Sequence, residues 1–329
     1  MKRLALSVFS IAFLALLYWV VDPGAVLRVL SAARVGPLLA AVLLLALAHI
    51  LSALRLSLLV PTARRLGLAE SLRLILAAAV LNLVVPAKGG DLLKSAFMRG
   101  RAGLDGPLAL ALVGFEKATD LLALLLWCAF GLVWEWQHQR AHGWLLALAL
   151  AGLCLGIGML ASSRLAATLL GAARRIAPLR ARRALLSLEN SWEIMRAYYW
   201  REPLRLLRVV LISLTIWLLH LLQIWLFALA LGADLPLATG LALAPLAILA
   251  GLLPITLAGV GTRDAALIAL FRGYMDPATG AALGLLATLR YLLPGLVGLP
   301  VLPRYLGELR AGGAAEPAAS SPPGDSRRR

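Results

Sequence analysis

The sequence is poor in charge for its length. Of its 329 residues only 15% are Asp, Glu, Lys or Arg, whereas 61% are hydrophobic. A soluble domain is usually about one quarter charged and about half apolar. The few charges lie in short, arginine-rich patches between long apolar runs, and a helix needs roughly 20 apolar residues to cross a hydrocarbon core about 30 Å thick. The composition excludes a soluble domain and predicts an all-α integral membrane protein.

Acidic residues are the scarcer of the two charge classes. The 16 Asp and Glu are outnumbered by 32 Lys and Arg, which gives a net charge of +16. Nucleic-acid binding would require a basic face on a soluble domain. Here the arginines lie mostly in loops between apolar runs, as the positive-inside rule for membrane proteins describes. Nucleic acid is therefore not an expected partner.

The sequence also lacks the patterns of common active and metal sites. Its two cysteines, Cys128 and Cys154, each lie inside an apolar run, so they form neither a disulfide framework nor a metal-ligand spacing. There is no Walker A pattern, no HExxH and no GxSxG with triad partners. We therefore expect no metal site, no cofactor and no catalytic residues.

The apolar runs predict about six full transmembrane helices. The first run is longer than the apolar core of a signal peptide, and Asp22-Pro23-Gly24 follows it instead of a small-residue cleavage site, so we interpret it as an uncleaved helix. The predicted spans are 4–21, 38–60, 107–134, 143–161, 207–231 and 278–302.

Two further apolar regions, 72–98 and 236–272, are each interrupted in the middle by Pro and Gly. The interruptions run from Pro86 to Asp91 and from Pro254 to Asp264. A broken helix exposes backbone N–H and C=O groups, which are tolerated at membrane depth only where protein or a water-filled cavity satisfies them. We interpret both regions as re-entrant hairpins that do not cross the membrane.

The distribution of arginine predicts the orientation. If the hairpins do not cross, the arginine-rich segments all lie on one side, which the positive-inside rule assigns to the cytoplasm together with both termini. These segments are 64–73, 99–101, 162–206 and 304–329. The first hairpin then enters from the cytoplasmic side and the second from the outside, which is the sequence pattern of inverted repeats.

The chain divides into a polytopic transmembrane domain, 1–310, and a tail, 311–329. The tail is small, polar and proline-rich, so we expect it to be disordered. The basic cytoplasmic loop, about 162–206, contains Trp192, Met195, Tyr198, Tyr199 and Trp200. Two interpretations stay open: a helix in the membrane interface with its aromatic side chains toward lipid, and a loop helix that packs on the bundle.

Polar and ionisable residues within the apolar segments are the candidates for function, because such groups are costly inside a membrane. The candidate substrate-binding residues are Arg55, Asn82, Lys88, Gly89, Gly90, Asp91, Lys94, Glu116, Lys117, Asp120, Gly259, Gly261, Arg263, Asp264 and Arg290. Glu116 and Asp120 are four residues apart, so they point from one face of a helix and can neutralise nearby cations. The alternative is that the charged groups pair only to hold the bundle together.

The cations at the two breaks suit a phosphate group. Arg presents a planar fork to phosphate oxygens and Lys a point charge, while the N-terminus of a broken helix adds oriented N–H groups. Lys88, Lys94 and Arg263 therefore predict an anion site near the middle of the membrane, and a lipid phosphate headgroup is the anion expected there. For the glycines alone, close helix packing is the alternative.

Three spaced motifs lie in the apolar segments. The first is Asn82-x3-Pro86-x-Lys88-Gly89-Gly90-Asp91, followed by Lys94 and Arg99. The second is Glu116-Lys117-x2-Asp120, and the third runs from Pro254 through Gly259-Val260-Gly261-Thr262-Arg263-Asp264. Together they resemble the motifs of a known family, the lysylphosphatidylglycerol synthase transmembrane region, also called the flippase-like family, with Lys117 where the family has Arg and Asp264 where it has Glu. Leu54-Arg55 is similar to the arginine of the family's second helix, and the resemblance covers nearly the whole chain in the right order.

This resemblance implies lipid translocation and hairpin-containing inverted repeats. The chain lacks the soluble aminoacyltransferase domain of long family members, so synthesis of an aminoacyl lipid is not expected. We predict a flippase- or scramblase-like lipid transporter of the bacterial inner membrane, acting on a phosphate-bearing or polyprenyl-phosphate-linked lipid. No ATP site is visible, so a gradient or simple equilibration would drive it.

Two alternatives remain. One is an intramembrane enzyme that modifies a lipid or lipid-linked glycan, for which Asp91 with Lys94 is the best candidate pair. The other is a non-catalytic membrane partner that recruits a lipid-modifying enzyme or glycosyltransferase through the basic loop. The expected partner in the main prediction is a membrane lipid with an anionic headgroup, and the oligomeric state stays open.

Overall fold

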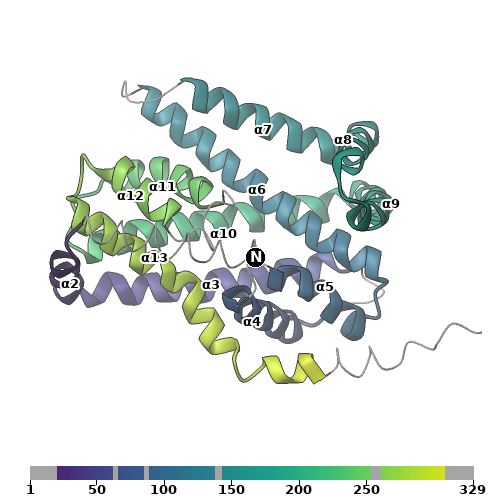
Figure 1. Ribbon diagram of the computed structural model, residues 1–329, viewed down its shortest axis with the longest axis horizontal. Coiled ribbons are helices and arrows are strands. Elements are labelled where there is room, and N and C mark those ends of the chain that lie inside the picture. The colour runs from purple at the N-terminus through teal and green to yellow at the C-terminus, as the bar shows by residue number, and fades with distance from the viewer. Residues whose placement is uncertain (1–20, 62–65, 85–88, 138–142, 253–260, 308–329) are drawn as a thin grey trace, which may run out of the picture.

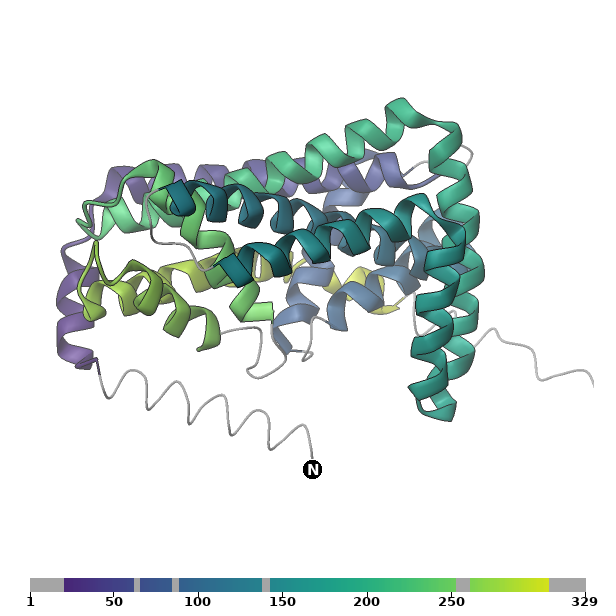
Figure 2. The same ribbon diagram turned by 90° about the horizontal axis from the view of Figure 1, so that it is seen from above.

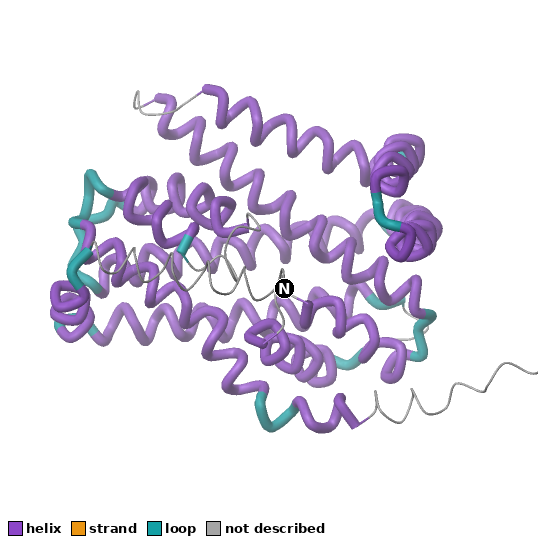
Figure 3. Tube along the Cα trace, in the orientation of Figure 1, coloured by secondary structure: helices purple, strands orange, loops and turns teal. Residues whose placement is uncertain are grey.

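The computed structural model describes residues 21–61, 66–84, 89–137, 143–252 and 261–307. Every regular element among them is a helix (Figure 3). The helices are α2 (Pro23–Ser31), α3 (Val35–Leu59), α4 (Leu68–Val84), α5 (Gly89–Ala102), α6 (Gly106–Gln137), α7 (Gly143–Ala161), α8 (Ser163–Ile176), α9 (Leu179–Arg201), α10 (Pro203–Ala230), α11 (Leu237–Leu252), α12 (Thr262–Phe271) and α13 (Pro277–Gly298). The prediction of an all-α chain is confirmed for this part.

The helices α3, α6, α7 and α10 run along the long axis of the bundle (Figure 1). Among the described helices, four have the length and apolar composition to cross a membrane: α3, α7, α10 and α13. The 32-residue α6 is longer still and carries three charged residues in its interior. Helices thus occupy five of the six predicted spans, and four of these qualify as spans; the sixth, 4–21, lies outside the described residues. The chain is a multi-pass helical membrane protein.

Two pairs of shorter helices occupy the regions predicted to be interrupted. The α4 and α5 helices have 17 and 14 residues and pack on each other, and α11 and α12 have 16 and 10 residues and do the same. At a rise of about 1.5 Å per residue none of them reaches the roughly 30 Å of a hydrocarbon core. The chain between the members of each pair, 85–88 and 253–260, lies outside the described residues. Gly89 to Asp91, predicted as part of the first break, begin α5.

The basic loop folds into α8 and α9, which run across the long helices at one end of the bundle (Figure 2). The inner face of α9 packs on α6: Trp192, Met195 and Tyr199 are buried, and Phe115 of α6 stacks on the Tyr199 ring. The interpretation in which the aromatic side chains of this loop face lipid is therefore wrong for these residues, because the bundle supplies them with a packing surface. Trp200, with 52% of its surface exposed, is the exception.

A junction between α9 and α10 also holds the end of α3. Arg205 is buried and donates hydrogen bonds to the carbonyls of Leu58 and Val60, at 2.7 and 3.0 Å, while the Tyr199 hydroxyl donates to the carbonyl of Leu59. The last carbonyls of a helix have no partner within the helix. Here two neighbouring helices satisfy them, which fixes α9 and α10 against the bundle.

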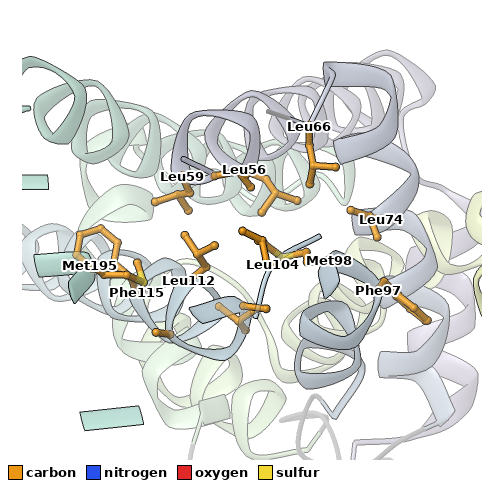
Figure 4. Packing of buried hydrophobic residues seen from close by; sticks show 14 of the residues in the cluster. Leu56, Leu59, Leu66, Leu74, Phe97, Met98, Leu104, Leu112, Phe115 and Met195 are labelled. Atoms are coloured by element: carbon orange, nitrogen blue, oxygen red, sulfur yellow. The ribbon is translucent and has the colours of Figure 1, made fainter. Parts of the chain in front are cut away.

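The largest hydrophobic cluster lies next to this junction, where α3, α4, α5, α6 and α9 meet. Figure 4 shows Leu56 and Leu59 of α3 facing Leu112 and Phe115 of α6, with Met195 of α9 beside them. Packing of this kind makes the helix positions rigid. The charged residues of α3, α5 and α6 therefore project from helices that are held at fixed separations.

Candidate functional site

The first group of predicted site residues forms a network between α3 and α6. Arg55 on α3 is 2% exposed, and its two terminal nitrogens bind two carboxylates of α6. The Nη1 atom lies 2.5 Å from Oδ1 of Asp120, and Nη2 lies 3.1 Å from Oε1 of Glu116. The predicted orientation of Glu116 and Asp120 toward a shared cation is confirmed, because residues four apart lie on one helix face.

The α5 helix contributes the other two members. The ammonium of Lys94, also 2% exposed, donates to Oε2 of Glu116, so Glu116 binds a different cation with each oxygen. The Asp91 carboxylate lies 2.9 Å from Nζ of Lys117, which is also 3.7 Å from Asp120. Asp91 and Lys94, the pair expected for an enzyme, thus each have a partner on α6 rather than each other.

The network is electrically balanced. Its three cations, Arg55, Lys94 and Lys117, are matched by the three carboxylates of Asp91, Glu116 and Asp120. Ser213 of α10 adds a neutral contact at 2.9 Å from Arg55 Nη1. Removing charges from water is costly unless each is paired and hydrogen-bonded, and this pairing meets that condition. Lys117, whose side chain is 45% exposed, is the member that faces outward.

Asn82, Gly89 and Gly90 lie beside the network. The amide nitrogen of Asn82 is 3.4 Å from Oδ1 of Asp91, and the amide oxygen of Asn82 is buried without a hydrogen-bond partner in the described part of the chain. A Cβ atom on Gly90 would lie 2.3 Å from the carbonyl oxygen of Ala78. The backbones of α4 and α5 therefore touch at Gly90, so close packing accounts for this glycine; its role in binding stays a prediction.

The second group lies at the start of α12. The backbone N–H of Gly261 donates to Oδ2 of Asp264 at 3.0 Å, and Oδ1 of Asp264 accepts from Nε and Nη2 of Arg263 at 2.9 and 2.7 Å. Gly261 has φ +103°, a backbone conformation that side-chain-bearing residues rarely adopt. Both charged side chains are almost completely buried, at 3% and 1% exposure. The pair is a local neutral unit that caps the helix.

Arg263 also reaches α13. Its guanidinium donates to the carbonyl oxygens of Gly284 and Ala287 and to the Thr288 hydroxyl, at 2.8, 3.3 and 2.9 Å. A Cβ atom on Gly284 would lie 2.8 Å from Asp264 Cγ, so this glycine makes room for the pair. The start of α12 is thereby held against the middle of α13.

Arg290 of α13 stands apart from both groups. Its guanidinium carbon lies 5.1 Å from the ring centre of Tyr291 and 5.9 Å from that of Trp217 on α10, and Nη2 donates to the Tyr291 hydroxyl at 2.9 Å. The Tyr291 ring also lies 6.0 Å from the guanidinium carbon of Arg263. Arg290 therefore adjoins the second group, and its nearest partners are aromatic.

The predicted site residues thus form two clusters, while Lys88 and Gly259 lie outside the described residues. Sequence reasoning missed Ser213, Trp217, Gly284 and Thr288. The hydroxyl groups of Ser213 and Thr288 interrupt apolar runs, and that signal was available. Nothing in the spacing of Trp217 or Gly284 distinguishes them from lipid-facing or packing residues.

Comparison with known proteins agrees with the motifs. A family model described as the lysylphosphatidylglycerol synthase TM region matches residues 3–298. This range contains every predicted site residue and the helices α2 to α13. No curated protein matches the sequence.

Proposed function

Because the chain belongs to the family of the lysylphosphatidylglycerol synthase TM region, we propose that it is a flippase- or scramblase-like transporter that moves a lipid between the leaflets of the bacterial inner membrane. The lipid carries a phosphate in its headgroup, either as a phospholipid or as a polyprenyl-phosphate-linked lipid. The observation that carries the proposal is the network of six charged side chains that joins α3, α5 and α6 inside a membrane protein.

A charged headgroup crosses a hydrocarbon core only if polar groups replace its hydration, because ionised groups are costly there. The network supplies both signs of charge at membrane depth. Lys117 is its exposed cation and shares carboxylates with its neighbours. A lipid phosphate that approaches Lys117 would compete with Asp91 and Asp120 for it. A passing headgroup would therefore contact the network only transiently, and the displaced carboxylate would pair with Lys117 again when the lipid moves on.

The two pairs of short helices support a transport pathway. We propose that α4–α5 and α11–α12 are re-entrant hairpins related as inverted repeats, and that both termini are cytoplasmic. The ends of α11 and α12 that connect to α10 and α13 lie at the end of the bundle opposite α8 and α9 (Figure 1). Short helices whose inner ends meet at membrane depth are the usual place for substrate sites in transporters built this way.

The energy source is proposed to be a gradient or the lipid distribution itself. The carboxylates of Asp91, Glu116, Asp120 and Asp264 lie within the helices and balance the cations. These carboxylates are the candidates for proton coupling, since protonation of one of them would release a cation for a phosphate.

The test is lipid exchange in liposomes that contain the purified protein and fluorescent phospholipid or polyprenyl-phosphate probes. We expect wild-type protein to move at least one probe between leaflets, and Lys117→Gln and Glu116→Gln to reduce the rate by tenfold or more, on the order of one charge-assisted hydrogen bond. Glu193→Gln on the exposed face of α9 serves as the control and keeps the wild-type rate. Intact, correctly loaded vesicles without exchange of any probe would contradict the proposal, as would a probe that is chemically altered instead of moved.

A further inference from the structure

We propose that Arg290 is the phosphate-binding residue of this protein, where its guanidinium and the indole N–H of Trp217 hold a phosphate monoester or diester. The inference rests on the proposed function, because it names the place in the bundle where the lipid headgroup binds. The proposed Arg290 site is distinct from the charge network of α3, α5 and α6.

Among the described candidate cations within the helices, Arg290 is the one without a carboxylate partner. The three cations of the network are matched by its three carboxylates, and Arg263 is matched by Asp264. Arg290 has no carboxylate within ion-pair distance in the described part of the chain. The undescribed segments before residue 308 contain no Asp or Glu at all, so none of them supplies one. A net positive charge therefore remains at this position.

The charge network and Arg290 differ in the energetic cost of binding an anion. An anion that enters the network must displace a carboxylate that already neutralises each cation, and the displaced carboxylate then lies unpaired at membrane depth. An anion at Arg290 displaces nothing and removes the cost of an isolated intramembrane cation. Charge alone thus favours Arg290 as the resting place of an anion.

The surroundings of Arg290 leave its donors available. The Trp217 and Tyr291 rings stabilise the cation through their faces, which uses none of its N–H groups. A guanidinium has five N–H donors, and among the described residues the one protein acceptor of Arg290 is the Tyr291 hydroxyl. The fork geometry of the remaining donors matches two oxygens of a phosphate.

Trp217 supplies an independent indication of a ligand. Its Nε1 atom is buried and has no hydrogen-bond acceptor in the described part of the chain. A buried N–H without an acceptor destabilises a fold, because it has given up its hydrogen bond to water. A phosphate oxygen beside the guanidinium would accept from this N–H as well, so one anion satisfies both groups.

The position in α13 suits a mobile headgroup. Arg290 lies within the span Pro277–Gly298, and Pro294 follows it by four residues inside the helix. Proline has no N–H to donate to the carbonyl four residues earlier, so α13 can bend at Arg290. Through the Tyr291 ring the site adjoins Arg263 at the start of α12.

The test measures binding separately from transport. Full-length protein in phosphatidylcholine nanodiscs is titrated with short-chain phosphatidylglycerol and, separately, with inorganic phosphate. Arg290→Gln removes the cation, and Trp217→Phe removes the N–H while keeping a ring. Arg73→Gln removes an exposed arginine that pairs with Glu70 and is the control for net charge. Thermal unfolding establishes that each variant is folded.

We expect binding of phosphatidylglycerol to weaken about ten- to a hundredfold in Arg290→Gln and about three- to tenfold in Trp217→Phe, and to be unchanged in Arg73→Gln. If Arg290→Gln does not fold, Trp217→Phe decides. Wild-type affinity in Arg290→Gln, or in Trp217→Phe when it must decide, overturns the proposal. Binding of inorganic phosphate without phosphatidylglycerol supports the anion site and assigns it to free phosphate.

Leaflet exchange in liposomes separates this inference from the proposed function. If Arg290→Gln exchanges lipid at the wild-type rate and binds phosphatidylglycerol with wild-type affinity, the Arg290 site is overturned and the proposal of lipid transport is unaffected. Phosphate binding that depends on Arg290, in a protein that exchanges no lipid, supports the site and overturns lipid transport.

Discussion

Arg55 on α3 and Asp120 on α6 form an ion pair with a distance of 2.5 Å between Nη1 and Oδ1. The two residues are far apart in the chain, and the one cation that α6 itself places near Asp120 is Lys117, at 3.7 Å. Glu116 then joins Arg55 to Lys94 of α5. Each charge of the network therefore depends on a different helix, and removing one leaves another charge buried without its partner.

Glu116→Gln is expected to destabilise the protein strongly. The substitution keeps the shape of the side chain but leaves Arg55 and Lys94, both 2% exposed, with less negative charge than positive. Breaking a buried pair typically costs about 3–5 kcal/mol. Thermal unfolding in detergent measures the loss. Glu193→Gln, at an exposed pair with Arg196, is the control and should cost at most about 1 kcal/mol. Equal losses of stability in Glu116→Gln and Glu193→Gln would mean that burial of the ion pair does not determine the loss.

Arg205→Met is expected to loosen α9 and α10 from the end of α3. The Met side chain keeps much of the packing, but the carbonyls of Leu58 and Val60 lose their donors. A buried acceptor without a partner costs about 1–3 kcal/mol. Tyr199→Phe removes the neighbouring bond to Leu59 and should cost about 1 kcal/mol. Hydrogen exchange of α9 measures the loosening, and unchanged protection in Arg205→Met would disprove this role.

Glycine-to-alanine substitutions should have opposite effects at two positions. A Cβ on Gly131 would lie 2.3 Å from the carbonyl oxygen of Ala242, so α6 and α11 must separate, at a cost of about 1–3 kcal/mol. A Cβ on Gly171, within α8, meets nothing within 4 Å, so Ala there should stabilise the helix by up to about 1 kcal/mol. Unfolding temperatures of the two variants provide the comparison. An unchanged or raised unfolding temperature in Gly131→Ala would contradict the close α6–α11 contact.

The stabilisation that the N-terminal cap of α13 provides should depend on pH. The Thr279 hydroxyl, together with the backbone N–H groups of Thr279 and Ala278, donates to the Asp276 carboxylate and lowers its pKa. A lowered pKa means that this stabilisation is complete above the unfolded value of about 3.9 and is lost as the pH falls through the lower pKa of the folded state. Unfolding measured from pH 7 to pH 3 should show a smaller acid-induced loss in Asp276→Asn than in wild type. Identical pH profiles would rule the carboxylate out as the cause.

Much of the architecture followed from local patterns. Runs of about 20 apolar residues correspond to helices because only helices satisfy their own backbone in lipid, and α3, α7, α10 and α13 begin and end within a few residues of the predicted limits. The Pro and Gly interruptions likewise fall between short helices or at their first residues. The surface against which the loop 162–206 packs did not follow from the sequence, because an amphipathic basic helix suits a membrane surface and a bundle surface equally.

The charged residues within the apolar helices can be identified from the amino-acid sequence, and helical periodicity places Glu116 and Asp120 on one face. Their pairing depends on how the helices pack. Spacing along the chain reports neighbours within one helix but carries no information about which helix lies opposite, so the partners of Arg55, Lys94 and Lys117 required the packing of α3, α5 and α6. The same holds for Arg290, which has no carboxylate partner among the described residues because α10 presents Trp217 to it instead.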